Sequence, residues 1–272
     1  MKIIFFGSSK FVIPIIKILN QSFDLVLVVT TDQLDGAVPT YCQQNKIEFI
    51  SIKKFNEVII QKLKSSKYPI AILADFGLII PEKILNLFPK GIINIHPSLL
   101  PKYRGPTPVQ TAILEGEKIT GVSIIRLDKQ VDHGPILNQV KEPILPNDTS
   151  ESLYQRLFDM GANLLPKTIT RYLKGDLKLS AQNHKEATFT NPLTRQNGFI
   201  DLTKIKPQKL KQMIKAYFPW PGVWSEIRTK DKVLRIKFLP ENKIQIEGKR
   251  PISYKDFING YPEVKNLLEK IH

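Results

Sequence analysis

Four short apolar runs in the first hundred residues constrain the fold of this chain most strongly. They are KIIFF (2–6), DLVLVVT (24–30), YPIAILA (68–74) and GIINI (91–95), and stretches with helical or turn character separate them. Runs of this length that are apolar on both faces are typical of parallel strands covered by helices. The pattern predicts an α/β fold with a doubly wound, mostly parallel sheet, whose ligands bind at the carboxyl ends of the strands.

The remainder of the chain continues with helices and strands and then changes character. A helix is expected at 108–116, strands at 121–127 and 136–144, and a long helix at 148–173 with a capping box at Thr149 and Ser152. Short alternating runs at 233–239, 243–248 and 250–254 predict a small β-rich, barrel-like module. We therefore expect a catalytic α/β domain at 1–173, a polar linker at 174–200 and a basic C-terminal domain at 201–272.

Composition narrows the class of protein. The chain of 272 residues has 42% hydrophobic residues and a single cysteine, Cys42. It has no apolar run near the ~18 residues that a membrane helix needs, and its first apolar run is too short for a signal peptide. A lone cysteine excludes an intrachain disulfide and a cysteine-rich metal site. These features predict a cytoplasmic protein with no membrane segment.

The chain is strongly basic, with a net charge of +15. From residue 201 onward there are 16 basic and 8 acidic residues, a net charge of +8, against +7 for the first 200 residues. One interpretation is a lysine-rich, solvated surface. The other is attraction to a polyanion, most simply a nucleic acid.

A constellation of polar residues stands at and after the fourth apolar run. Asn94 and His96 are two residues apart, so they project from the same face at the end of a predicted strand. The later loop DKQVDHG supplies Asp128 and Asp132, and Gly134 permits a tight turn there. Taken singly, each has a structural explanation, as a strand-end histidine, a turn-forming amide or a turn aspartate. Together they form a candidate catalytic set.

The wider sequence around this set resembles a known family. NIHPSLLPKYRG (94–105) and VDHGPIL (131–137) resemble the 10-formyltetrahydrofolate-dependent formyltransferases, which carry an Asn-x-His…Asp catalytic set and a Ser-Leu-Leu-Pro loop. The stretches MKIIFFGSSKF, ADFGLIIPEKIL and AYFPWPGVW are similar to members of the family that act on initiator methionyl-tRNA. The resemblance covers nearly the whole chain.

The resemblance implies a role for each matching residue. It places catalysis on Asn94, His96 and Asp132. The folate co-substrate is expected at Phe76, Leu78, Ile80, Ser98, Leu99, Leu100, Pro101, Asp128 and Val131. The amine acceptor, methionyl-tRNA, is expected at Gly7, Ser8, Phe11, Lys102, Arg104, Lys209 and Lys211. We expect a monomer that uses no metal.

The residue types suit formyl transfer. A primary amine attacks the formyl carbon, and the formyl oxygen gains negative charge that N–H donors from Asn94 and His96 can stabilise. Asp132 can orient the imidazole and help a water molecule carry away the proton of the amine.

Other functions remain open from the sequence alone. An N-formyltransferase for an amino sugar nucleotide would carry the same catalytic set, and a non-catalytic RNA-binding relative would keep the fold. A Ser-His-Asp hydrolase is disfavoured because there is no Gly-x-Ser-x-Gly motif.

Two departures from the family pattern bear on the identity of the acceptor. The loop VVTTDQLDGAVPTYC has Asp32 and Asp35 where enzymes of methionyl-tRNA usually have a long basic loop, and the C-terminal region is short.

Overall fold

The computed structural model describes residues 1–65, 68–229 and 232–269, and within them it forms two β-sheets. The larger sheet has seven strands in the order β3-β2-β1-β4-β5-β6-β7. The strands are β1 (Lys2–Phe6), β2 (Asp24–Thr30), β3 (Phe49–Ser51), β4 (Ile70–Leu73), β5 (Ile92–His96), β6 (Ile119–Arg126) and β7 (Ile136–Pro143). The predicted α/β class is confirmed.

The sheet is parallel on one side and antiparallel on the other. β1 pairs in parallel with β2 and β4, and β4 pairs in parallel with β5. β6 then runs antiparallel to both β5 and β7. In this register Asn94 of β5 lies beside Leu73 of β4, and His96 lies beside Ser123 of β6. The carboxyl end of β5 is thus flanked by strands on both sides, in the interior of the sheet.

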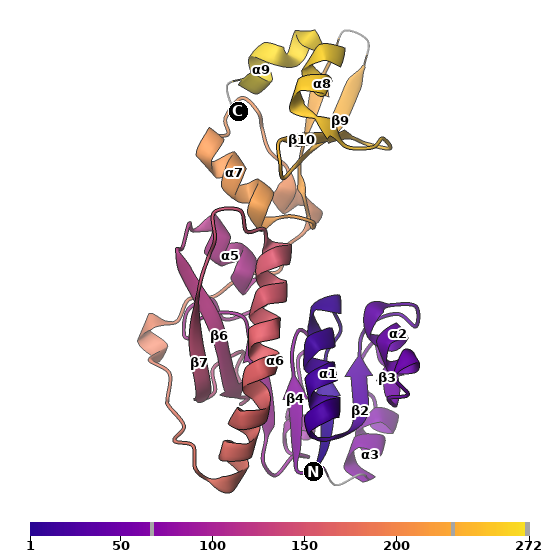
Figure 1. Cartoon of the computed structure of the whole chain (residues 1–272), viewed down its shortest axis with the longest axis vertical. Coiled ribbons are helices and arrows are strands. Elements are labelled where there is room, and N and C mark those ends of the chain that lie inside the picture. The colour runs from indigo at the N-terminus through magenta and orange to yellow at the C-terminus, as the bar shows by residue number, and fades with distance from the viewer. Residues whose placement is uncertain (66–67, 230–231, 270–272) are drawn as a thin grey trace. The chain divides into compact units, whose positions relative to one another are not determined.

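Helices cover both faces of the large sheet. They are α1 (Ile13–Ser22), α2 (Ala37–Gln44), α3 (Glu57–Ser65), α4 (Glu82–Leu85) and α6 (Ser150–Lys174), whereas α5 (Pro108–Leu114) belongs to the second compact unit of the chain. Figure 1 shows α1 and α6 in front of the strands. Gly161 lets α6 approach β5 closely, since a Cβ there would lie 2.7 Å from the Ile95 side chain. The expected capping box of α6 is present: the hydroxyl groups of Thr149 and Ser152 accept from each other's backbone N–H at 3.2 and 3.0 Å.

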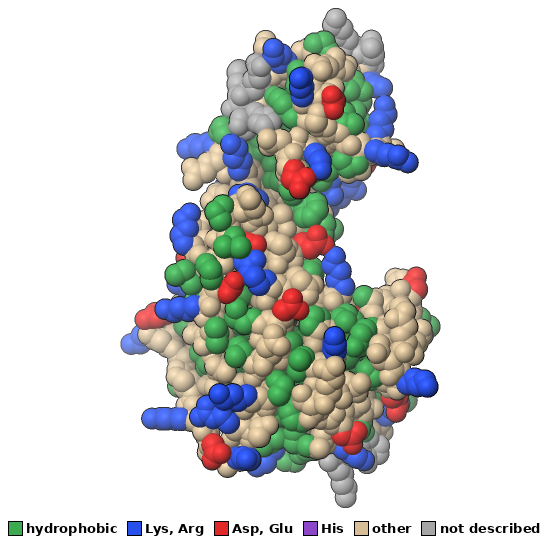
Figure 2. Space-filling model, viewed as in Figure 1, with side chains coloured by type: hydrophobic (Ala, Val, Ile, Leu, Met, Phe, Trp, Pro, Cys, Tyr) green, Lys and Arg blue, Asp and Glu red, His purple; other side chains and the backbone are tan. Residues whose placement is uncertain are grey.

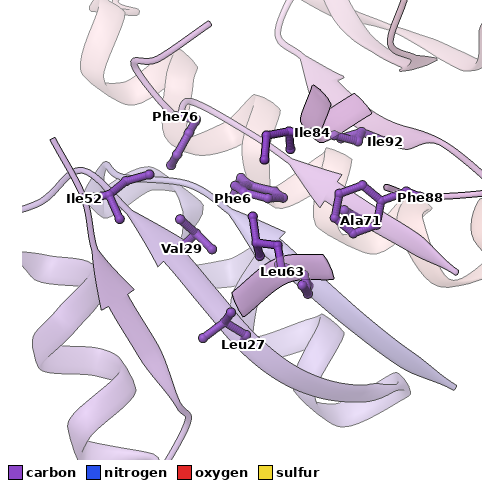
Figure 3. Packing of buried hydrophobic residues seen from close by; sticks show 11 residues of the cluster. Phe6, Leu27, Val29, Ile52, Leu63, Ala71, Phe76, Ile84, Phe88 and Ile92 are labelled. Atoms are coloured by element: carbon purple, nitrogen blue, oxygen red, sulfur yellow. The ribbon is translucent and has the colours of Figure 1, made fainter. Parts of the chain in front are cut away.

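An aromatic cluster fills the opposite face of the sheet, under α3 and α4 (Figure 3). Phe6 of β1 is fully buried at its centre, with ring centroids 5.3 Å from Phe76 and 6.3 Å from Phe88. Burial of apolar side chains of this size contributes about 1.5–3 kcal/mol each. This packing fixes the ends of β1 and β4, which lie next to the candidate site.

The C-terminal part of the chain forms a second, antiparallel sheet in the order β11-β10-β9-β8. Its elements are α7 (Pro207–Ala216), β8 (Val223–Arg228), β9 (Val233–Leu239), β10 (Lys243–Ile246), β11 (Ile252–Ser253), α8 (Tyr254–Gly260) and α9 (Lys265–Glu269). The expected β-rich C-terminal region is confirmed. The sequence analysis did not predict α8 and α9.

The chain divides into two compact units, which are described separately. Unit 1 comprises 1–106, 119–143 and 154–190, and unit 2 comprises 107–118, 144–153 and 191–272. Residues 174–190 of the expected linker lie in unit 1, and residues 191–200 lie in unit 2. No helix in the described part of the chain combines the length and apolar character needed to cross a membrane.

Candidate active site

The candidate site begins at the carboxyl end of β5. Asn94 and His96 are almost fully buried there, at 5% and 4% exposure. The alternation of a β-strand sends both side chains to one face. The loop that follows brings Tyr103 back to the strand end, because the Nε2 atom of His96 lies 2.9 Å from the Tyr103 carbonyl oxygen.

Asp132 joins this pair from the connection between β6 and β7. Its Oδ1 accepts from the Nδ2 of Asn94 at 3.1 Å, and its Oδ2 lies 3.5 Å from the Nδ1 of His96. The backbone N–H of Gly105 also donates to Oδ2, at 2.9 Å. Asp132 has a φ of 49°, in the left-handed region that non-glycine residues rarely adopt. The structure therefore brings the three predicted catalytic side chains together around one carboxylate.

The hydrogen-bond partners fix the orientation of each group. A carboxylate only accepts, so the amide of Asn94 must present its nitrogen to Asp132, and its second N–H is left for another acceptor. A carbonyl also only accepts, so the proton of His96 is on Nε2 and points to Tyr103. From the sequence, a ring N–H of His96 is expected to donate to the formyl oxygen. In this structure the loop after β5 supplies the acceptor for Nε2 instead.

The Ser-Leu-Leu-Pro loop is anchored by buried hydrogen bonds. Ser98 is fully buried, and its hydroxyl donates to the Lys102 carbonyl at 2.7 Å. The Ser123 hydroxyl donates to the Ser98 carbonyl at 2.6 Å and accepts from the Leu100 N–H at 3.1 Å. Leu100 is 3% exposed, whereas Leu99 and Pro101 are half-buried. The loop is thus held rigidly against β6.

The other residues expected to bind folate lie at neighbouring strand ends. The ring of Phe76 is in the aromatic cluster, and Leu78 and Ile80 pack partly buried against it. Asp128 is bound to the Nδ1 of His133 at 2.6 Å, and Val131 is 53% exposed. Phe76 therefore offers a ligand only its backbone, while Val131 offers an exposed side chain.

The residues expected to meet the amine lie at the ends of β1, β2 and β4. The Ser8 hydroxyl donates to the Phe76 carbonyl at 3.0 Å and accepts from the Thr31 N–H at 2.9 Å. Gly7 is required because a Cβ would lie 2.8 Å from the Ala74 carbonyl oxygen. Phe11 stacks on Tyr154 of α6, with ring centroids 5.5 Å apart.

The four basic residues expected to contact the acceptor differ in their surroundings. Lys102, Lys209 and Lys211 are exposed. Arg104 is only 3% exposed, and its guanidinium donates to Gln182 and lies against His184. In this structure Arg104 is therefore not placed to meet a phosphate. Lys230, one of the basic residues of the C-terminal region, lies outside the described residues.

Several residues of the site carried no usable signal in the sequence. Gln182 and His184 come from the segment expected to be a linker, and the His184 ring stacks on His133 at 3.9 Å. Asp75, near Ser9, is exposed when the whole residue is considered, and its φ is 45°. Desolvation raises the pKa of the Asp75 carboxyl, and the nearby Ser9 hydroxyl offsets part of that effect. Among the described residues no group of three or more His, Cys, Asp or Glu is arranged to hold a metal ion.

Comparisons with known proteins agree on one family. The formyl transferase family model matches residues 1–169. The methionyl-tRNA formyltransferase of Koribacter versatilis is 33% identical and covers 96% of both chains. That of Carboxydothermus hydrogenoformans is 31% identical over 96% of this chain and 87% of its own.

Solved structures show the same fold. A 4-N formyltransferase from Francisella tularensis has a TM-score of 0.69 at 20% identity, covering 88% of this chain and 97% of its own. A phosphoribosylglycinamide formyltransferase from Anaplasma phagocytophilum has a TM-score of 0.58 at 25% identity, covering 70% and 99%. Because the family model matches more than half of the chain and full-length relatives exceed 30% identity, this protein belongs to the formyltransferase family.

Proposed function

We propose that this protein transfers the formyl group of 10-formyltetrahydrofolate to the α-amino group of initiator methionyl-tRNA, for use in translation initiation. The relatives that support this acceptor carry the name methionyl-tRNA formyltransferase and align with the C-terminal region as well as with the catalytic unit. The Ser-Leu-Leu-Pro loop and the Asn-x-His…Asp set support the folate donor.

One observation carries the proposal. The Asp132 carboxylate accepts from Asn94 and faces His96, so one anion orients both of the groups next to it. The second N–H of the Asn94 amide is then available to a formyl oxygen. One donor of this kind is worth ~10²–10³ in rate, because the negative charge on that oxygen exists only in the transition state.

Transfer conserves atoms and charge in two steps. The amine nitrogen bonds to the formyl carbon, and an electron pair of the carbonyl moves to the oxygen. Collapse restores the carbonyl and breaks the bond to N10 of the folate. The amine loses one proton and N10 gains one. Asp132, through a water molecule, is the group in the site that can accept the proton from the amine.

His96 provides positive charge next to the reacting carbon when its ring holds both protons. Nε2–H then donates to Tyr103 and Nδ1–H faces Asp132 at 3.5 Å. Nε2 has an acceptor in Tyr103 and Nδ1 has the Asp132 carboxylate beside it, so a charged ring would have a partner on each side despite its burial. We propose that it stabilises the oxyanion by charge, and that it can also donate directly where substrate binding displaces the Tyr103 carbonyl.

The donor would bind between the loop at 98–101 and the turn at 128–133. Both stand at the carboxyl edge of the sheet, where doubly wound folds bind their ligands. The exposed Val131 and the backbone at Phe76 are available there for the pterin. A folate analogue should compete with the donor and raise the melting temperature, because it binds only the folded state. Saturating analogue without either effect would remove this placement.

The aminoacyl end of the acceptor would meet the ends of β1 and β4 in unit 1, and the basic residues of the C-terminal region would attract the tRNA backbone. Lys and Arg side chains are spread over both units on the face shown in Figure 2. The loop after β2 has acidic side chains in place of basic ones, and the Asp32 carboxylate accepts from the Val38 N–H at the start of α2. Attraction to the tRNA backbone is therefore assigned mainly to Lys204, Lys206, Lys209, Lys211 and Lys215 and to the basic stretch from Arg228 to Lys237.

The identity of the acceptor is tested by comparing the rates of formyl transfer to different candidate acceptors. Initiator methionyl-tRNA, elongator methionyl-tRNA and dTDP-amino sugars are each offered with saturating 10-formyltetrahydrofolate, and kcat/KM is measured for each. The proposal predicts the highest value for a methionyl-tRNA. A higher kcat/KM for an amino sugar nucleotide would assign the protein to the other branch of the family, and binding of tRNA without transfer would identify a non-catalytic RNA-binding protein.

A further inference from the structure

Gln182 connects the turn that carries Asp132 to the loop that follows β5 by hydrogen bonds to both. Its side chain is 6% exposed and lies in the polar segment after α6. Nε2 donates to the backbone carbonyls of Asp132 at 2.8 Å and Gly134 at 2.7 Å. Oε1 accepts from the Nε and Nη2 of Arg104 at 3.2 and 2.7 Å. Because the carbonyls only accept, the orientation of this amide is fixed, and both of its ends are used.

Arg104 is an unusual partner for an amide. Its guanidinium is buried at 3% exposure and also lies 2.8 Å from the Nδ1 of His184. Burying a guanidinium is costly unless its hydrogen bonds are made. Burial lowers the pKa of Arg104, and the carboxylates of Asp132 and Asp128 oppose that effect. The positive charge therefore acts on the catalytic carboxylate through space while Gln182 binds the head group.

The backbone on either side of Arg104 contacts both catalytic groups. The carbonyl of Tyr103 accepts from His96, and the N–H of Gly105 donates to Asp132. This stretch is held in turn by the segment at 188–190. The N–H of Arg104 donates to the Thr188 carbonyl at 2.9 Å, and the Thr190 N–H donates to the Arg104 carbonyl at 2.8 Å.

We propose that Gln182 and Arg104 are a pair of positioning residues that set the distance between Asp132 and His96. The inference rests on the catalytic roles given above. Asp132 adopts a left-handed conformation, which is strained at a non-glycine residue and persists where its surroundings hold it in place. Gln182 binds its carbonyl and that of Gly134, and Arg104 ties this turn to the residues that hold His96.

The test is a double-mutant cycle on kcat in the full-length protein. Gln182→Glu is nearly isosteric, but it sets a carboxylate oxygen against the two carbonyls that Gln182 now binds. We expect kcat to fall up to about 10²-fold, the effect of a misplacement near 1 Å. In an Asp132→Asn background the same change should lower kcat by less than about threefold, because residues that act as a unit are not additive.

A matched control separates positioning from stability. Asn138 donates to the Thr168 hydroxyl at 3.1 Å in the same unit, away from the catalytic carboxylate. Asn138→Asp is the same amide-to-acid change and should lower the melting temperature while leaving kcat unchanged. If Gln182→Glu does not fold, Gln182→Met, which introduces no buried charge, replaces it in the double-mutant cycle with Asp132→Asn.

The outcomes are distinct. An equal loss of kcat from Gln182→Glu in both backgrounds would show a structural role and overturn the inference. Full kcat in Gln182→Glu, together with impaired Asp132→Asn, would also overturn it and leave the proposed function standing. Full kcat in Asp132→Asn alone would instead refute the catalytic assignment on which the inference rests.

Discussion

Replacing Asp132 by Asn should reduce formyl transfer more than any other isosteric change in the site. The carboxylate accepts from Asn94 at one oxygen and from Gly105 at the other, and the second oxygen also lies 3.5 Å from the Nδ1 of His96. An amide has a single acceptor oxygen. Whichever way the new side chain turns, its NH₂ group faces at least one of these partners. The variant therefore loses a negative charge and a hydrogen-bond acceptor at once, with almost no change in volume.

The magnitude follows from the role of the carboxylate. It accepts hydrogen bonds from Asn94 at 3.1 Å and from Gly105 at 2.9 Å, and a hydrogen bond to a charged group is worth about 1.5–3 kcal/mol. Loss of a proton acceptor alone typically costs 10²–10⁴ in rate, so we expect kcat to fall by about 10³, near 4 kcal/mol of activation free energy.

The assay is single-turnover formylation of methionyl-tRNA at saturating donor, with Asp148→Asn as control. Asp148 is 5% exposed and accepts from the Leu145 N–H at 2.7 Å and the Ser152 hydroxyl at 2.9 Å. Its replacement turns one of the two accepting oxygens into an NH₂ group, which should cost about 1–3 kcal/mol of folding stability and leave turnover unchanged. An Asp132→Asn rate within threefold of the wild type would refute the reasoning.

Three further predictions follow from the same structure. His96→Ala should lower turnover by about 10² or more without unfolding the protein, as measured by initial rates and a melting curve; near-normal turnover would contradict its role. Asp75→Asn should stabilise the protein at neutral pH, because the pKa of the Asp75 carboxyl is raised in the folded state. The folded wild type therefore binds this proton more tightly than the unfolded chain does. Its stability falls as pH rises from the unfolded pKa to the folded pKa, and it stays lower at higher pH. Chemical denaturation should thus show a difference at pH 7 that disappears below pH ~3, and a difference of the opposite sign would contradict it. The double variant Lys209→Gln, Lys211→Gln should reduce the slope of log K for tRNA binding against log salt concentration by up to about 0.9 for each phosphate that these lysines no longer neutralise. The control Lys62→Gln, at an ion-paired position of unit 1, should leave the slope unchanged. Equal slopes in the wild type, the double variant and the control would exclude α7 from the tRNA interface.

The large sheet could be predicted because its signal is local. Strands buried on both faces need continuous apolar runs, and the strands at 2–6, 24–30 and 70–73 lie within such runs. The proximity of Asn94 and His96 also follows from the two-residue period of a strand. The capping box at the start of α6 is likewise a local pattern, and its hydrogen bonds are present.

The rest of the site depends on contacts between distant or backbone groups. Arg104 looks like a surface residue beside Lys102, but its partners Gln182 and His184 come 78 and 80 residues later. No periodicity links those positions. The acceptor for His96 is the carbonyl of Tyr103, and every residue has a carbonyl, so side-chain identity could not reveal it. The short helices α8 and α9 are likewise set by packing in unit 2 rather than by a long amphipathic pattern.

The central claim is that the α-amino group of methionyl-tRNA receives a formyl group from the folate donor. The most direct measurement uses donor labelled with ¹³C in the formyl carbon, followed by mass spectrometry of the amino acid released from the tRNA. The account predicts N-formylmethionine that carries the label, in an amount that grows with enzyme and is lost in the Asp132→Asn variant. Unmodified methionine, with the label recovered on an amino sugar nucleotide or left on the folate, would contradict it.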